Sequence, residues 1–145
     1  MRYIFTLAIC LFSFFIFSQD SNKTRDQLEV KFTFSQECKG LIFISCFQKE
    51  DNFLDEDKAE FSKVLECQDS ILIEGLNPDL PRAIVAFLDI NRNKKLDLNF
   101  IGIPIEPYAI SNGFSGKWRE PKFEDAAEAS SIKKIQLDFL FWRER

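Results

Sequence analysis

The hydrophobic and polar positions of the chain alternate over several short stretches. In LEVKFTF (28–34), every second residue from Leu28 to Phe34 is apolar, and the residues between them are polar. A period of two residues is typical of an antiparallel strand that buries one face. The segment IKKIQLDFLFW (132–142) alternates in the same way from Ile135 onward. We therefore expect a strand near each end of the chain, each with one buried face.

Further apolar stretches predict strands between these two. They are residues 41–47, 61–67, 70–76 and 82–89. The stretch 82–89 is apolar almost throughout, which favours a central strand covered on both faces. Because only a short linker ending at Gly40 separates 28–34 from 41–47, the first two strands are expected to form a hairpin. Residues 122–129 contain helix formers and predict a very short helix.

The number and spacing of these stretches predict an all-β fold. About seven short strands with no long helix are typical of an antiparallel β-sandwich or a small barrel. The predicted core is made of apolar residues on three of these strands: Val30, Phe32, Phe34, Val85, Phe87, Leu137 and Phe139. Most of the stretch near 89–131 lacks this alternation, so we expect a long loop there.

The composition fits one β-rich domain and excludes several kinds of chemistry. The chain has 145 residues, of which 46% are hydrophobic, and this suits a single globular domain. Its 17 Phe residues favour strands and a β-rich core. The sequence contains no His. That absence excludes Ser-His nucleophilic catalysis and His-ligated metal sites.

The N-terminus has the layout of a secretory signal peptide. Arg2 precedes an uncharged, mostly apolar stretch (3–17), and Ser18 follows it. This stretch is shorter than the ~20 residues that a membrane-spanning helix needs. We expect cleavage near Ser18 and a secreted or periplasmic protein, with a retained N-terminal anchor as the alternative. The expected divisions are a signal peptide (1–18), a flexible N-terminus (19–27) and one β-sandwich domain (28–142).

The net charge limits which partners are expected, and the cysteine content limits which disulfides can form. Removal of residues 1–18 takes away Arg2 alone, so the formal net charge moves from −4 to −5. An acidic surface disfavours nucleic acid and anionic lipid as partners, and the cleaved chain would have no transmembrane segment. The partner is then expected to be an envelope or extracellular protein or glycan. Cys38, Cys46 and Cys67 remain, and either Cys38 and Cys67 form a disulfide or all three are small buried thiols.

The stretch DINRNKKLD (89–97) is the candidate for metal chemistry. Counted from Asp89, oxygen donors fall at positions 1, 3, 5, 7 and 9 of an EF-hand-like loop, as calcium coordination requires. The candidate ligands are Asp89, Asn91, Asn93, the carbonyl of Lys95, Asp97 and a returning Glu106. Lys94 stands where such loops have Gly, and Phe100 stands where they have a bidentate Glu. We expect either a weak calcium (Ca²⁺) site or a metal-free turn in which Asp and Asn bond to their own backbone.

A longer segment around this loop resembles a bacterial protein family. IVAFLDINRNKKLDLNFIGIPIEPYAISNG, followed by EPKFEDA, is similar to the pattern AvavfhDeNgNgklDtnflGiPkEgygfSnn and PsFedA of the domain of unknown function 2141. The similarity runs from about residue 28 to residue 141. It implies a secreted or envelope-associated β-sandwich of transthyretin-like or immunoglobulin-like type, with no assigned activity. This chain has Leu88, Lys94 and Ala109 where the family has His, Gly and Gly.

Two classes of function are compatible with these features. The first is a non-catalytic envelope module that binds a partner or serves only as a structural domain. Its polar residues after the loop are Glu106, Tyr108, Ser111 and Asn112, which form either a binding patch or an ordered crossover. The second is a hydrolase with one carboxylate as acid and another as base. Its candidate pairs are Asp89 with Asp97 and Glu106 with Asp125. The absence of His and of a nucleophile motif favours the module.

Overall fold

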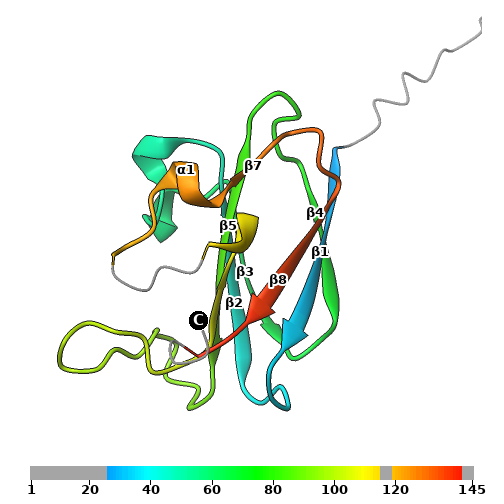
Figure 1. The fold of residues 1–145 in the computed structure, drawn as a ribbon. Helices are drawn as coiled ribbons and strands as arrows, with labels where there is room; N and C mark the ends of the chain where they lie inside the picture. The colour runs from blue at the N-terminus through cyan, green and yellow to red at the C-terminus, as the bar shows by residue number, and fades with distance from the viewer. Residues whose placement is uncertain (1–25, 115–118, 142–145) are drawn as a thin grey trace, which may run out of the picture.

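The computed structural model describes residues 26–114 and 119–141, which form two β-sheets packed face to face (Figure 1). The strands of this described part are β1 (Gln27–Phe34), β2 (Leu41–Phe47), β3 (Phe61–Glu66), β4 (Ser70–Glu74), β5 (Arg82–Asp89), β6 (Tyr108–Ile110), β7 (Ala127–Glu128) and β8 (Lys134–Phe139). Its short helices are η1 (Glu50–Asn52), η2 (Glu56–Lys58), η3 (Ser111–Gly113) and α1 (Phe123–Ala126). The predicted all-β sandwich is confirmed.

The strand order shows how the two sheets are connected. One sheet has the order β4–β1–β8, and the other has the order β3–β2–β5–β6, with β7 also paired with β5. The named strands pair antiparallel except β1 and β8, which run parallel. The predicted hairpin of residues 28–34 and 41–47 is wrong, because β1 and β2 belong to different sheets. Both strands bury an apolar face, and packing across the core buries the two faces together.

The core lies between the sheets and contains most of the predicted residues. Val30, Leu137 and Phe139 are at most 1% exposed, and Phe32 is 7% exposed. Phe34 is only partly buried, and its ring stacks on Phe139 with the centroids 5.0 Å apart. The alternation at both ends of the chain therefore predicts the buried face of β1 and β8 correctly.

The face of β5 that packs in the core is the opposite of the predicted face. Ile84, Ala86 and Leu88 are buried in the main core, whereas Val85 and Phe87 point to the outer face of the five-stranded sheet and are half-buried. Because nearly every residue of β5 is apolar, its sequence gives no alternation by which to choose the face. The strand is central, as predicted, since β2 lies on one side and β6 and β7 lie on the other.

A second, smaller apolar cluster covers part of that outer face. Phe53 packs edge-on against Phe47 and Phe123, with ring centroids 5.5 and 5.8 Å apart. Ala126 of α1 and Ile110 of β6 are buried in the same cluster. The region near 89–131, expected to be a long loop, thus also contains β6, η3, α1 and β7.

The cysteines resolve into one disulfide and one buried thiol. Cys38 and Cys67 are bonded, and they join the linker after β1 to the residue after β3. The prediction of this bridge is confirmed. Cys46 is free and fully buried, and its burial raises the pKa of the thiol to about 12. The Cys46 side chain therefore serves as a small apolar group of the core.

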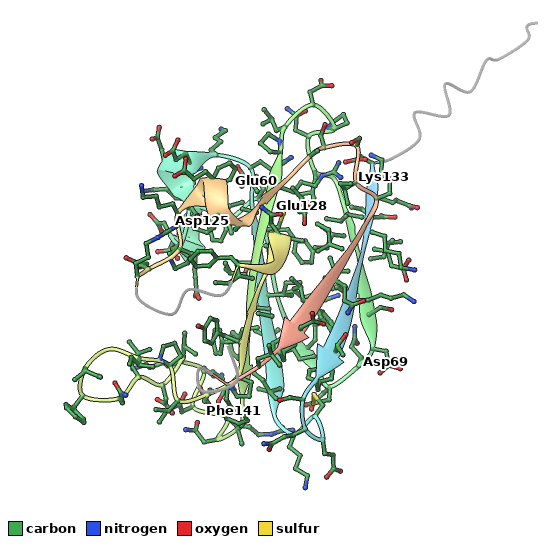
Figure 2. The ribbon with its side chains drawn as sticks, in the orientation of Figure 1. Glu60, Asp69, Asp125, Glu128, Lys133 and Phe141 are labelled. Carbon is green, nitrogen blue, oxygen red and sulfur yellow. A yellow bond between two sulfur atoms is a disulfide. The ribbon has the colours of Figure 1, made fainter. Side chains whose placement is uncertain are left out.

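A buried ion pair fixes the start of β1. The guanidinium of Arg82 is fully buried and pairs with Asp26, whose side chain is 7% exposed, and it also donates to the carbonyl of Ile132 at 2.7 Å. Lys133 bonds to Asp26 as well, at the end of the sandwich where β1 begins (Figure 2). The hydrogen bond from Lys133, with the charge of Arg82, lowers the pKa of Asp26. The described residues thus include Asp26 and Gln27, which precede the domain start expected at residue 28.

The expected signal peptide (1–18) and most of the expected flexible N-terminus fall outside the described residues. Within the described part of the chain, no helix has both the length and the apolar character to cross a membrane.

Candidate functional site

The candidate cation loop begins where β5 ends, at Asp89. This side chain is fully buried, although its neighbour Ile90 is 45% exposed. One carboxylate oxygen accepts the backbone N–H of Asn93 at 3.1 Å, and the other accepts that of Lys94 at 2.7 Å. Asp89 thus folds the following residues back over the end of its own strand.

The two asparagines continue this arrangement. The side-chain oxygen of Asn91 accepts the N–H of Asn93 at 3.0 Å, and that of Asn93 accepts the N–H of Lys95 at 2.9 Å. Both side-chain amides donate to the carboxylate of Asp97, at 2.5 Å from Asn91 and 2.9 Å from Asn93. The predicted oxygens at residues 89, 91, 93 and 97 are therefore gathered in one hydrogen-bonded turn, as both readings of the sequence require.

The backbone of this turn is left-handed at two positions that are not glycine. Arg92 has φ 61° and Lys94 has φ 65°. For a residue with a side chain, this conformation costs about 1–2 kcal/mol relative to the right-handed one. The Gly expected at position 94 of such a loop would adopt it without that cost. Gly40 lies against the start of the loop, and a Cβ at Gly40 would be 2.1 Å from the carbonyl oxygen of Asp89.

Glu106 holds the two ends of the loop together from beneath. Its side chain is 4% exposed; one oxygen accepts the N–H of Ile90 at 2.9 Å and the other accepts the N–H of Asp97 at 3.1 Å. The side chain of Glu106 thus contacts both ends of the loop, as expected for a residue at which the chain returns to it. Because each oxygen already accepts a backbone N–H, the carboxylate is occupied in closing the loop.

The donor set limits what the loop can bind. Within residues 26–114 and 119–141, no three or more Asp, Glu, Cys or His side chains form a group that could hold a metal ion. The available oxygens are two carboxylates, of Asp89 and Asp97, two amide oxygens and backbone carbonyls. Oxygen donors of this type suit calcium, which takes carboxylate, amide and carbonyl ligands. The positive charges of Lys94 and Lys95 lie in the same turn and oppose a cation.

The loop also forms one wall of an apolar groove on the outer face of the five-stranded sheet. The groove has a volume of about 1020 Å³. Its floor includes Phe43 and Phe87, which are partners on β2 and β5 and stack with their centroids 4.7 Å apart. Residues 94–104 form one wall, while residues 54–56, Phe114 and residues 119–121 line the groove from the side of the short helices. In Figure 1 the loop and these helices lie on the same side of β2 and β5, at opposite ends.

This groove was not predicted from the sequence. A signal was present, because the segments 41–47 and 82–89 are apolar on both faces, whereas a solvated outer face alternates with polar residues. The walls come from segments far apart in the chain. Their proximity depends on the tertiary fold and is not encoded in any local pattern.

Other predicted polar residues have structural partners. Ser111 is fully buried, and its hydroxyl accepts the N–H of Ile84 at 2.8 Å and donates to the carbonyl of Ala126. The side-chain amide of Asn112 donates to the carbonyl of Asp125 at 3.2 Å. These contacts join η3 to β5 and α1, so the segment forms an ordered crossover. Tyr108 lies in β6 and lines the groove.

The carboxylate of Asp125 is engaged by an arginine. Arg119 donates to its two oxygens at 2.5 and 2.7 Å, and the N–H of Lys122 donates at 2.8 Å. The Arg119 hydrogen bonds lower the pKa of Asp125 to about 2. Figure 2 shows Asp125, a residue of α1, on the side of the sandwich that carries the loop. The carboxyl group is thus ionised at neutral pH and paired.

Comparison with known proteins identifies one family. A family model described as "Uncharacterized protein conserved in bacteria (DUF2141)" matches residues 30–135, which span both sheets and the whole candidate loop. Searches of curated proteins and of solved structures give no significant match. Because the match covers most of the chain, the protein belongs to the bacterial DUF2141 family.

Proposed function

We propose that the protein is a secreted or periplasmic, non-catalytic binding module whose loop 89–106 binds calcium weakly and shapes the apolar groove. The observation that carries this proposal is the gathering of the oxygens of Asp89, Asn91, Asn93 and Asp97 in the turn that also lines the groove. A cation that stiffens this turn would stiffen one wall of the groove. The groove is the surface through which the module contacts its partner.

In this proposal, Asp89 and Asp97 supply the charge for calcium. Asn91, Asn93 and the carbonyl of Lys95 would add neutral oxygens, and Glu106 would keep the loop closed. Binding requires the amides of Asn91 and Asn93 to release Asp97, which costs hydrogen bonds that the metal-free loop already makes. With the two lysines in the same turn, we expect a dissociation constant on the order of 0.1–1 mM, in the range of extracellular calcium modules.

The carboxylates that a hydrolase would need are poorly suited to acid–base catalysis. Asp89 is fully buried and both its oxygens accept backbone N–H groups. Asp125 is held ionised by Arg119, so it is a poor proton donor near neutral pH. These contacts support a binding role over a catalytic one.

The secretion part of the proposal rests on the signal-peptide pattern of residues 1–18. N-terminal sequencing of the protein recovered from its natural cell tests it. A sequence that begins near Gln19 is expected, and a sequence that begins at Met1 would contradict export with cleavage.

Thermal melts with calcium and with chelator test the metal site. At about 100 times the dissociation constant, calcium adds about 2.7 kcal/mol to the free energy of unfolding. Asp89→Asn should abolish this calcium-dependent rise in Tm. It should also lower Tm in chelator, because the amide nitrogen that replaces one Asp89 oxygen cannot accept the backbone N–H group that this oxygen accepts.

Two substitutions of Lys94 distinguish the effect of its positive charge on calcium binding from the effect of its left-handed backbone on stability. Lys94→Gly removes both the positive charge and the left-handed strain at φ 65°, so it should raise Tm in chelator and strengthen calcium binding. Lys94→Gln removes the charge alone and should strengthen calcium binding only. Equal melting of the wild type with calcium, with magnesium and with chelator would show that the loop is a metal-free turn.

A further inference from the structure

The outer face of the five-stranded sheet is largely apolar, and the described residues cover only part of it. At one end, Phe53, Phe123 and Ala126 pack onto β2, β5 and β6 and form the second cluster. Toward the other end, Phe43 and Phe87 form the floor of the open groove. Antiparallel sheets normally present polar residues on a face that meets water. The open part of this face is therefore a surface that a partner would cover.

The tip of the loop beside the groove is a second uncovered apolar surface. Phe100 is 98% exposed, Ile101 is 63% exposed and Leu98 is 53% exposed. The tip is held in place by its backbone, because Asn99 N–H donates to the carbonyl of Ile103 at 2.8 Å. The side chain of Asn99 accepts two further N–H groups of the tip, each at 3.0 Å. Phe100 is thus presented on a preformed turn, with little ordering cost on binding.

The two sides of the groove carry opposite charges. Lys94 and Lys95 are exposed on the loop wall, while Glu56 and Glu120 are exposed on the wall next to the short helices. None of these four takes part in the ion pairs found among the described residues. Arg119, on the same wall as the glutamates, is already paired with Asp125. The loop wall is therefore positive and the opposite wall is negative.

We propose that the occupant of the groove is a second copy of this chain, in a two-fold symmetric dimer in which each copy inserts Phe100 and Ile101 into the groove of the other. This inference rests on the proposed binding role of the groove and names its partner. The two-fold axis lies in the contact plane, perpendicular to the line that joins the two walls of one groove. This axis places the loop wall of one copy against the glutamate wall of the other. Lys94 and Lys95 then face Glu56 and Glu120 twice.

A second copy accounts for all three features, whereas a small apolar anion and an anionic lipid surface each account for fewer. A small apolar anion would neutralise the lysines but would leave Phe100 exposed and place negative charge near the glutamates. An anionic lipid surface would cover the loop tip and attract the lysines, but it would repel Glu56 and Glu120 on the opposite wall. The dimer covers the groove and the tip together and pairs both sets of charges.

Sedimentation equilibrium of the protein, produced from the full chain, tests the dimer. We expect a reversible monomer–dimer equilibrium in calcium-containing buffer. Phe100→Asp should raise the dimer dissociation constant by about 30-fold or more, as removal of a central aromatic contact does. Leu72→Asp is the matched control, because Leu72 is 50% exposed on β4 of the other sheet. It should leave the dimer unchanged.

Charge reversal gives a test that a folding defect cannot imitate. Lys94→Glu/Lys95→Glu makes both walls negative, and Glu56→Lys/Glu120→Lys makes both walls positive, so each variant alone should be monomeric. An equimolar mixture of the two variants should form a heterodimer, because each copy then offers complementary walls to the other. A mixture that stays monomeric, or wild type that is monomeric at millimolar concentration, would overturn the proposal.

A fluorescent probe distinguishes two negative outcomes: the protein does not dimerise, or its groove does not bind apolar molecules at all. Nile red is an uncharged dye that fluoresces on open apolar surfaces, so its fluorescence should be higher with the Lys94→Glu/Lys95→Glu monomer than with an equal concentration of wild-type dimer. If wild type is monomeric and binds the probe, the groove remains a binding site and only the second copy is excluded. If wild type is monomeric and does not bind the probe, the proposed binding role of the groove fails as well.

Discussion

Glu106→Gln should destabilise the protein through the loop, although it keeps the shape of the side chain. The two Glu106 oxygens accept the N–H groups of Ile90 and Asp97, at 2.9 and 3.1 Å, and the side chain is 4% exposed. Glutamine has a single acceptor oxygen, so its amide group must point its own hydrogens at one of these N–H groups. One charge-assisted hydrogen bond is lost, and one partly buried N–H group is left without its partner.

The magnitude follows from these contacts. A hydrogen bond to a charged group contributes about 1.5–3 kcal/mol, and the second bond weakens because the acceptor is now neutral. We expect a loss of about 2–3 kcal/mol in the free energy of unfolding. For a domain of this size, that corresponds to a fall in Tm of about 8–12 °C.

Urea denaturation and thermal melts of wild type, Glu106→Gln and Glu66→Gln provide the assay. Glu66→Gln is the control because Glu66 pairs with Arg92 of the same loop at 3.0 Å, but both side chains are largely exposed. Exposed pairs contribute about 0–1 kcal/mol. If both variants lose the same small amount of stability, Glu106 does not hold the loop closed.

Three further predictions concern the core, the disulfide and pH. Phe32→Ala should lower the free energy of unfolding by about 3–5 kcal/mol, because Phe32 is 7% exposed in the main core. Phe87→Ala, on the half-buried groove floor, should lower it clearly less. Equal losses in urea denaturation would contradict the assigned faces of the two strands. Replacing Cys38 and Cys67 together by Ala opens a loop with a sequence separation of 29 and should cost about 3–4 kcal/mol, whereas an unchanged denaturation midpoint would be inconsistent with the bridge. Pairing lowers the pKa of Asp26, and it lowers the pKa of Asp125 to about 2. Both carboxylates should therefore stabilise the fold above about pH 4 and lose this effect as the pH falls toward 2. Asp125→Asn should reduce the fall in Tm at low pH, and an unchanged fall would exclude a contribution from Asp125.

The strands at the two ends of the chain could be predicted because their alternation is strict. Leu28 to Phe34 and Ile135 to Phe139 each have one apolar face, and the structure buries that face in both. The gathering of the loop oxygens could also be predicted, since Asp89, Asn91, Asn93 and Asp97 are close in sequence and bond mainly to each other and to nearby backbone. Such local hydrogen bonding depends on spacing alone.

The pairing of strands and the groove could not be predicted for a different reason. Strand β1 pairs with β4 and β8, which are far from it in the sequence, whereas hairpin reasoning considers only neighbours. Strand β5 is apolar on both faces, so its pattern does not distinguish the core from the groove floor. The charges of the groove walls come from Glu56, Lys94, Lys95 and Glu120, which only the tertiary fold brings around one surface.

A calcium titration followed by nuclear magnetic resonance shows whether the loop 89–106 is a calcium-binding wall of the groove. Calcium is added to the chelator-treated, ¹⁵N-labelled protein, and magnesium at matched ionic strength serves as the control. We expect the backbone amide signals of Asn93, Lys94 and Lys95 to shift and saturate with calcium in wild type, with no saturating shift in Asp89→Asn. Amide signals of the loop that respond equally to calcium and magnesium, without saturation, would contradict it.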